Sequence, residues 1–218
     1  MNNLDTERNR NRLELHNTFI LAIATMGVAW CSYQAALWGG IQTFRLAESN
    51  KYGRLAQQKA IQAGQNTAME AAVTISFMNA VVDNDQKKVD FVIRGVRPEL
   101  GSVLQQWVQL RKLNPDSAPA HPMITPAYDD LVKKRMGESE KMSEMAGDKY
   151  KHAEAANYNS DRYAFLGVLF SMVLFLGAVT TKLARVQPRL VLTVIATIIC
   201  IGALLWVCFN LPVAHKGK

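Results

Sequence analysis

The sequence predicts an all-helical integral membrane protein, with three transmembrane helices and a long helical-hairpin extramembrane domain between the first and the second. The first observation is that three runs contain no Asp, Glu, Lys or Arg, namely residues 15–44, 163–181 and 190–214. The second is their length, because a helix rises about 1.5 Å per residue and a hydrocarbon core is about 30 Å thick. Soluble helices rarely stay uncharged for so long, and here this happens three times.

The chain begins with a polar tail, residues 1–16, which we expect to be flexible. The first transmembrane helix is expected at 17–40. Its apolar stretch is longer than the core of a secretory signal, so we interpret it as a retained anchor. The second and third spans are expected at 163–181 and 190–211, joined by a basic turn at 182–189. A C-terminal tail follows at 212–218.

The helical extramembrane domain is expected at 41–162, with two long arms at about 41–82 and 126–162. No proline interrupts either arm, so each arm is expected to continue its span as one helix. Shorter helices and a Pro-rich loop are expected between the arms, at 83–125. Asp83, Asn84 and Asp85 predict a stop and a new cap, and Pro98 suits the first turn of a further helix that ends near Leu113.

Prolines define the loop at 114–126, because a regular helix cannot accommodate them at this density. They are Pro115, Pro119, Pro122 and Pro126. Thr125 before Pro126, with Asp129 in the first turn, predicts the start of the second arm, since the three supply a cap, a fitting φ and a favourable charge.

Charge and cysteine content narrow the function classes. The net charge is +7, but residues 41–162 hold 17 Lys and Arg against 15 Asp and Glu, so the excess lies at the membrane borders. Nucleic acid is therefore not an expected partner, whereas the lipid bilayer is. The three cysteines, Cys31, Cys200 and Cys208, all fall in apolar runs, which indicates neither a disulfide framework nor a thiolate metal site.

A stripe of small residues is the most informative pattern. In alternating steps of three and four it follows one face of the first span, and a similar row occurs in the second span. Its members are Ala22, Thr25, Ala29, Ser32, Ala36 and Gly39 in the first, and Gly167, Ser171 and Ala178 in the second. Small residues at this spacing let helix backbones approach closely in lipid. We expect this helix-packing stripe to contact the other arm or a second subunit.

A polar cluster, Ser32, Tyr33 and Gln34, lies within the first span. Gln34 is costly in lipid unless it is paired, so we expect it to face another helix or water. An interhelical hydrogen bond is the favoured interpretation, and a pore or ligand contact is the alternative.

Residues for catalysis or cofactor binding are not apparent. The histidines, His16, His121, His152 and His215, are scattered without the spacing of a metal site. The sequence lacks a nucleophile elbow, a P-loop, a dinucleotide fingerprint and a CxxC pair. We therefore expect no enzyme, no cofactor and no bound metal.

Orientation follows from the basic residues. Lys182, Arg185 and Arg189 in the turn share a side with the basic N-terminal tail, and the positive-inside rule places both in the cytoplasm. The N-terminus is then cytoplasmic and the domain periplasmic, although acidic residues in the N-terminal tail and Lys216 and Lys218 at the other end oppose this.

The segment 30–58 (WCSYQAALWGGIQTFRLAESNKYGRLAQQ) and the closing TKLARVQPR turn before the last span resemble uncharacterised bacterial three-span inner-membrane proteins. The resemblance implies a multi-pass protein of the bacterial inner membrane and carries no activity or functional residue. The layout is also similar to the TolQ, ExbB and MotA group of proton-channel subunits, but the spans lack the proline and motif pattern of that group.

The expected function is a non-enzymatic membrane scaffold or accessory subunit, which forms a homo-oligomer or joins a membrane complex through its helical domain. A channel or transport component, with a pore formed by several copies, is the alternative. The two differ in whether a continuous polar path crosses the bilayer.

Overall fold

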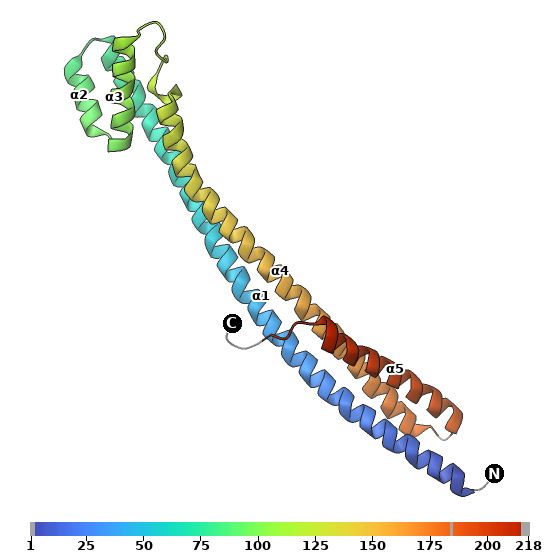
Figure 1. Cartoon of the computed structure of the whole chain (residues 1–218). Coiled ribbons are helices and arrows are strands. Elements are labelled where there is room, and N and C mark those ends of the chain that lie inside the picture. Colours follow the sequence, from blue (N-terminus) through green and yellow to red (C-terminus); the bar gives the residue numbers. More distant parts are fainter. Residues whose placement is uncertain (1–2, 184, 215–218) are drawn as a thin grey trace. The chain divides into compact units, whose positions relative to one another are not determined.

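The computed structural model describes residues 3–183 and 185–214, with side chains from residue 11 onward, and every regular element in them is a helix (Figure 1). The elements are α1 (Asn3–Val82), α2 (Gln86–Gly95), α3 (Pro98–Leu113), the short 3-10 helix η1 (Pro122–Ile124), α4 (Pro126–Lys182) and α5 (Val186–Asn210). The all-helical class predicted from the sequence is confirmed for these residues.

The helix ends follow local capping chemistry. α1 ends at Val82, and the carboxylate of Asp85 accepts a hydrogen bond from the Lys88 backbone N–H at 3.1 Å to begin α2. Asn84 lies between the two helices in the left-handed region, with φ 55°, which asparagine tolerates better than most residues. The acidic run at 83–85 is therefore both the stop and the new cap that the sequence predicts.

The second arm also begins where the sequence predicts. The Thr125 hydroxyl accepts from the Tyr128 backbone N–H at 3.3 Å, and Pro126 occupies the first helical position of α4. From there α4 continues without interruption to Lys182. Span and arm are one helix, because no residue between them removes a backbone donor or supplies a competing cap.

The N-terminus differs from the expectation of a flexible tail. α1 already includes residues 3–16, so most of the polar tail belongs to the helix. This segment contains neither proline nor glycine, and it extends a helix that already exists, so it needs no new nucleus. Residues 215–218 of the predicted C-terminal tail lie outside the described residues.

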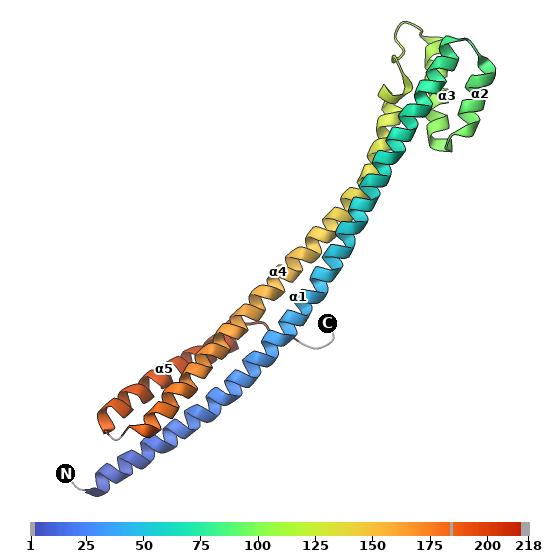
Figure 2. The same ribbon diagram turned by 180° about the vertical axis from the view of Figure 1, so that it is seen from behind.

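The chain divides into two compact units, and α1 and α4 contribute to both. Unit 1 comprises residues 1–47 and 149–218, and unit 2 comprises residues 48–148. In unit 1, α4 runs antiparallel to α1, and α5 runs beside α4 (Figures 1 and 2). The core of unit 1 is built from all three helices.

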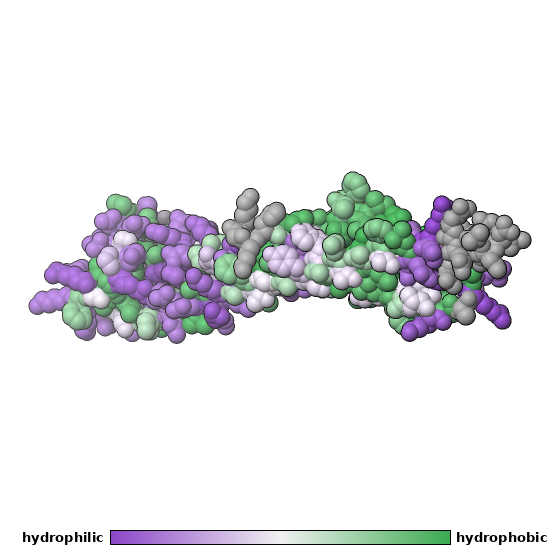
Figure 3. Space-filling view, turned by 90° about the horizontal axis from the view of Figure 1, so that it is seen from below, coloured by the Kyte–Doolittle hydropathy of each residue, from purple (hydrophilic) through white to green (hydrophobic). Residues whose placement is uncertain are grey.

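Among the described residues, three helices are long and apolar enough to cross a membrane, and they contain the three predicted spans except for Leu211 at the end of the third. Their outward side chains are largely apolar; Met26, Phe175 and Ile198 are examples of exposed ones. Figure 3 shows this hydrophobic surface over unit 1, whereas hydrophilic side chains predominate on the visible face of unit 2. The chain therefore has the features of a multi-pass membrane protein.

The core of unit 2 joins the end of α1 to α2, α3 and the start of α4. Phe77 and Trp107 meet edge to face at its centre, with ring centroids 5.8 Å apart. The indole N–H of Trp107 donates to the Pro119 carbonyl oxygen at 2.8 Å, which ties the Pro-rich loop to this core. Further along the arms, the Ser49 hydroxyl donates to the Ala146 carbonyl and the Ser139 hydroxyl to the Ala56 carbonyl, both at 2.9 Å. These bonds fix an antiparallel pair.

A close helix contact of unit 1, between Gly27 and Phe170, generates a stability prediction. A Cβ on Gly27 would lie 2.8 Å from ring atoms of Phe170, which is itself 1% exposed and has little room to move. Gly27→Ala should therefore destabilise the protein by about 1–3 kcal/mol. The higher helix propensity of alanine offsets part of this cost. Gly202→Ala is the matched control, because nothing lies within 4 Å of its added Cβ. Thermal unfolding in detergent measures both, and equal melting temperatures would contradict this contact.

Candidate functional site

The structure separates the members of the predicted polar cluster. Gln34 is buried at 1% exposure, whereas Ser32 and Tyr33 face outward from unit 1. Consecutive helical residues are rotated by about 100°, so three neighbours cannot share one face. Of the three, Gln34 alone belongs to the interior.

Gln34 holds the segment that follows α5. Its side-chain oxygen accepts from the Ala214 backbone N–H at 2.8 Å, and its amide nitrogen donates to the Ala214 carbonyl oxygen at 3.4 Å. Two further side chains, the Trp38 indole and the Tyr163 hydroxyl, donate to the Pro212 carbonyl oxygen at 3.1 and 3.3 Å. Residues 211–214 are thus fastened to α1 and α4, and we call this arrangement the tail clamp.

The tail clamp satisfies polar groups that lipid would leave unpaired. The amide of Gln34 and the non-helical backbone at Pro212 and Ala214 each find a partner within the chain, as a membrane environment requires. Gln34 is thus paired within the chain, but with the non-helical segment after α5, whereas the sequence predicted a hydrogen bond between two helices. Sequence reasoning missed Trp38 and Tyr163 as partners, because no local pattern links a tail to residues about 50 and 175 positions earlier.

A second polar level lies at the opposite end of the spans, beside the turn between α4 and α5. Buried Asn17 donates to the Gly177 carbonyl oxygen at 3.2 Å, and Arg189 pairs with Glu14 at 3.3 Å. His16 is 3.2 Å from the Thr197 hydroxyl. The start of α1 and the basic turn therefore lie at the same end of unit 1. Lys182 and Arg185 border this turn and are exposed, whereas the side chains of Arg8 and Arg10 lie outside the described residues.

Between these two levels the buried side chains are apolar or cysteine. Ala24, Cys31, Phe170, Val173 and Cys200 are all 3% exposed or less. This interior separates Asn17 from Gln34 by about 25 Å of helix. Within the described part of unit 1, one copy of the chain thus has polar side chains at both ends and an apolar centre.

The stripe on α1 faces away from the intramolecular core. Five of its members are exposed, namely Ala22, Thr25, Ala29, Ser32 and Ala36, while Gly39 is partly buried near Ser160. α4 and α5 pack instead on the other side of α1, along Ile20, Ala24, Cys31 and Gln34. A contact of the stripe with a second copy stays a prediction.

The row on α4 divides between two faces. A Cβ on Gly167 would lie 3.7 Å from the Cβ of Cys31, so this position adjoins α1, whereas Ser171 and Ala178 are exposed. On α5 a row of small residues that sequence reasoning missed forms the buried face: Thr193, Ala196, Cys200 and Ala203. Its steps of three and four residues were visible in the sequence, and a search for small residues in the third span would have found it.

Unit 2 contains one buried carboxylate, that of Glu70, which is 3% exposed. Arg135 binds both of its oxygens, at 2.8 and 2.9 Å, and the Tyr128 hydroxyl donates to it at 3.2 Å. A guanidinium nitrogen of Arg97 lies 3.8 Å away and also donates to Asn66. Two-point binding of a carboxylate is the strongest geometry available to arginine. The pair therefore joins α1 to α4 at a fixed register.

Glu70 also raises the pKa values of its partners Arg135 and Tyr128. Its hydrogen bond raises the pKa of Arg135, against the opposing effect of burial. Burial, followed by the charge of Glu70, raises the pKa of Tyr128. Tyr128 thus remains a neutral hydrogen-bond donor. All carboxylate partners are cations or neutral donors, which is typical of a structural ion pair.

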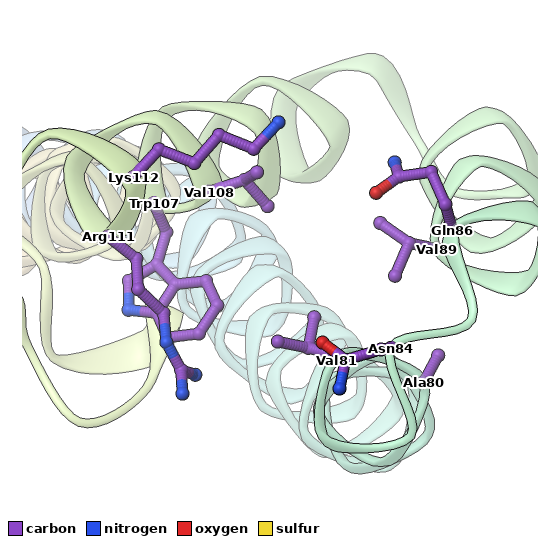
Figure 4. A pocket seen from close by; sticks show the side chains of 9 residues that line it. All are labelled: Ala80, Val81, Asn84, Gln86, Val89, Trp107, Val108, Arg111 and Lys112. Carbon is purple, nitrogen blue, oxygen red and sulfur yellow. The ribbon is translucent and has the colours of Figure 1, made fainter. Parts of the chain in front are cut away.

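A pocket of about 240 Å³ opens in unit 2 between the end of α1, α2 and α3. Figure 4 shows side chains of α3 on one side of it and those of α1 and α2 on the other. Its lining residues are Ala80, Val81, Asn84, Gln86, Val89, Trp107, Val108, Arg111 and Lys112. Valine side chains and Trp107 form its floor, and the two cations lie at the end of α3. This pocket was not predicted, because its residues come from three separate helices.

Among residues 3–183 and 185–214, no three His, Cys, Asp or Glu side chains are grouped closely enough to hold a metal ion. Comparison of the chain with protein-family models, with curated proteins and with solved structures finds no match. The likeness to three-span inner-membrane proteins therefore stays a prediction.

The tail clamp generates a test of Gln34. Gln34→Leu removes both hydrogen bonds to Ala214. Each contributes about 1 kcal/mol, so the tail should detach at least tenfold more often. The probe is Ala214→Cys in a background without the three native cysteines, because Ala214 is only 6% exposed. Maleimide labelling should accelerate in Gln34→Leu.

Tyr33→Phe is the control for this measurement, because it changes the neighbouring, exposed side chain and should leave the labelling rate unchanged. Equal labelling rates in Gln34→Leu and the parent would show that Gln34 does not hold the tail.

Proposed function

We propose that the chain is a non-enzymatic membrane scaffold or accessory subunit, which assembles with further copies or partners through its exposed helix faces. The observation that carries the proposal is the outward orientation of the small-residue stripe on α1. A small-residue face gains nothing over a large one when it meets lipid, whereas it lets another helix approach closely. Unit 1 leaves this face uncovered.

The exposed surface of α1 supports the proposal by its division into two faces. Large side chains, those of Phe19, Met26 and Tyr33, lie along one line at exposures of 51–75%. The small residues lie along a second line, about a quarter of a turn away. A helix that met only lipid would have no reason to separate large from small side chains.

Unit 2 supports the proposal through its arrangement and its surface. The arms 48–82 and 126–148 form an antiparallel hairpin whose ends are held by the Glu70 and Arg135 pair. Its many charged side chains suit water, so we propose that this hairpin is the extramembrane domain.

A pore is the weaker alternative. The polar residues that suggested it separate into the buried, paired Gln34 and the exposed Ser32 and Tyr33. The apolar centre of unit 1 then interrupts any polar path through one copy, so that a pore would have to form between copies. The exposed small residues favour close helix contact there over a water-filled channel.

The proposed location is the bacterial inner membrane, with the N-terminus cytoplasmic and unit 2 periplasmic. Lys182, Arg185 and Arg189 cluster at the turn, and the Glu14 and Arg189 pair brings the start of α1 to the same end. The positive-inside rule assigns this end to the cytoplasm.

Enlarging the stripe should reduce assembly without unfolding the chain. Ala29→Leu and Ala36→Leu add bulk where unit 1 has no neighbour, so we expect a smaller oligomeric mass in mild detergent and an unchanged melting temperature. The cost of overpacking a helix crossing is about 1–3 kcal/mol per site. Mass measurement of the solubilised protein, supported by cross-linking in the membrane, tests this.

Two variants serve as controls for the stripe. Ala24→Leu enlarges a side chain that is 0% exposed and should lower the melting temperature, whereas Met26→Leu changes an outward residue and should affect neither quantity. A parent protein with the mass of a single chain, both before and after cross-linking and without a partner, would contradict the proposal.

Cysteine labelling tests the orientation. In a background without native cysteines, Ser117→Cys in the Pro-rich loop and Gln187→Cys near the basic turn should differ towards an impermeant maleimide on intact cells. Labelling of position 117 alone is expected for a periplasmic unit 2. The reverse pattern would invert the topology.

A further inference from the structure

The pocket between the end of α1, α2 and α3 combines an apolar floor with a cationic edge, and the proposed function does not account for it. The partly exposed Val81 and Val108 supply apolar surface above the buried Val89 and Trp107, and Arg111 and Lys112 come from the last turn of α3. No acidic residue is among the described residues that line it. The cations also suit the end of a helix, but that role does not require a cavity beside them.

Some polar groups around the pocket already have partners within the chain, and others do not. The Trp107 indole N–H already donates to Pro119, and the Gln86 amide donates to Asp90 at 2.9 Å. Arg111 lies over the Trp107 ring at 5.2 Å, whereas Lys112 forms no ion pair with the described residues. In Figure 4 the long side chains of Arg111 and Lys112 extend from α3 beside the opening. The available interactions are therefore apolar contact below and positive charge at the edge.

The volume distinguishes the kind of occupant. Sites for small organic ligands commonly measure about 300–1,000 Å³ and enclose most of the ligand. At about 240 Å³ and open to solvent, this pocket suits one or two side chains and not a whole cofactor. A side chain presented by a protein segment also places neighbouring residues over the edge, where the cations lie.

We propose that this pocket binds an acidic and apolar peptide segment of a partner protein, with an aliphatic side chain on the apolar floor and adjacent carboxylates paired with Arg111 and Lys112. This rests on the proposed function as a scaffold, and it specifies the chemistry of the partner. The segment competes for Arg111 with the face of Trp107, so binding changes the surroundings of that indole ring.

The experiment uses the full chain in lipid nanodiscs, with 5-fluorotryptophan in place of tryptophan. The sequence has four tryptophans, and Trp30, Trp38 and Trp206 belong to unit 1, where they act as internal controls. The Trp107 fluorine signal is assigned with Trp107→Phe. The probe is the acetylated and amidated peptide Glu-Leu-Leu-Glu, added up to millimolar concentration, beside the peptides Gln-Leu-Leu-Gln and Lys-Leu-Leu-Lys.

We expect the Glu-Leu-Leu-Glu peptide alone to shift the Trp107 signal, with the unit 1 signals unchanged. Arg111→Gln combined with Lys112→Gln should weaken this binding about tenfold, because both exposed ion pairs with the peptide are lost. Val108→Phe fills the pocket without changing its charge and should also abolish the shift. Lys133→Gln with Lys134→Gln removes two exposed cations of unit 2 that do not line the pocket, and should leave the binding unchanged.

The inference is overturned if no peptide shifts the signal, if the neutral peptide binds equally well, or if the Arg111 and Lys112 variant binds as the parent does. Parent-like binding by the Val108→Phe variant would overturn it as well. Absence of peptide binding leaves the oligomeric mass of the parent unaffected. If the parent has the mass of a single chain but still binds the peptide, only oligomer formation is overturned.

Discussion

The close antiparallel contact between α1 and α4 is the constraint on which the rest of the structure depends. It is close enough that side-chain hydroxyls reach backbone carbonyls of the opposite helix, as Ser160 reaches Ala35 at 3.0 Å in unit 1 and Ser139 reaches Ala56 in unit 2. Such reach requires small residues at the crossing, and Gly27 beneath the Phe170 ring shows how little space remains. In unit 1 α5, and in unit 2 α2 and α3, share a core with this pair.

Polar groups mark the two ends of the apolar interior of unit 1, and each has a chemical reason to be there. An unpaired amide or peptide group costs several kcal/mol in hydrocarbon. Gln34 and the 211–214 segment satisfy one another at one end, and Asn17 bonds the Gly177 carbonyl at the other. In unit 2 the Glu70 carboxylate is likewise paired on both oxygens. These groups specify register, since a shift along the helices would leave them without partners.

The exposed surfaces of the two units differ in the kinds of side chains that they present. On unit 1 most exposed side chains are large and apolar, which lipid alone explains, so the small-residue line on α1 is the exception. On unit 2 single exposed apolar side chains such as Met69 and Phe91 are ordinary for a surface that faces water. The inference of assembly therefore draws on the small-residue line of unit 1.

The sequence by itself determined the spans and the helix ends other than the start of α1, because those depend on nearby residues. Asp85 and Thr125 cap through a backbone N–H three residues away, and uncharged runs of sufficient length are visible without a fold. The tertiary structure alone decided which face of α1 is buried. In water a packed face is recognised by its contrast with a polar one, but in a membrane the outside is apolar too, so periodicity carries no such contrast. The buried line through Ala24, Cys31 and Gln34 is set by the shapes of α4 and α5, and by an Ala214 partner 180 residues away.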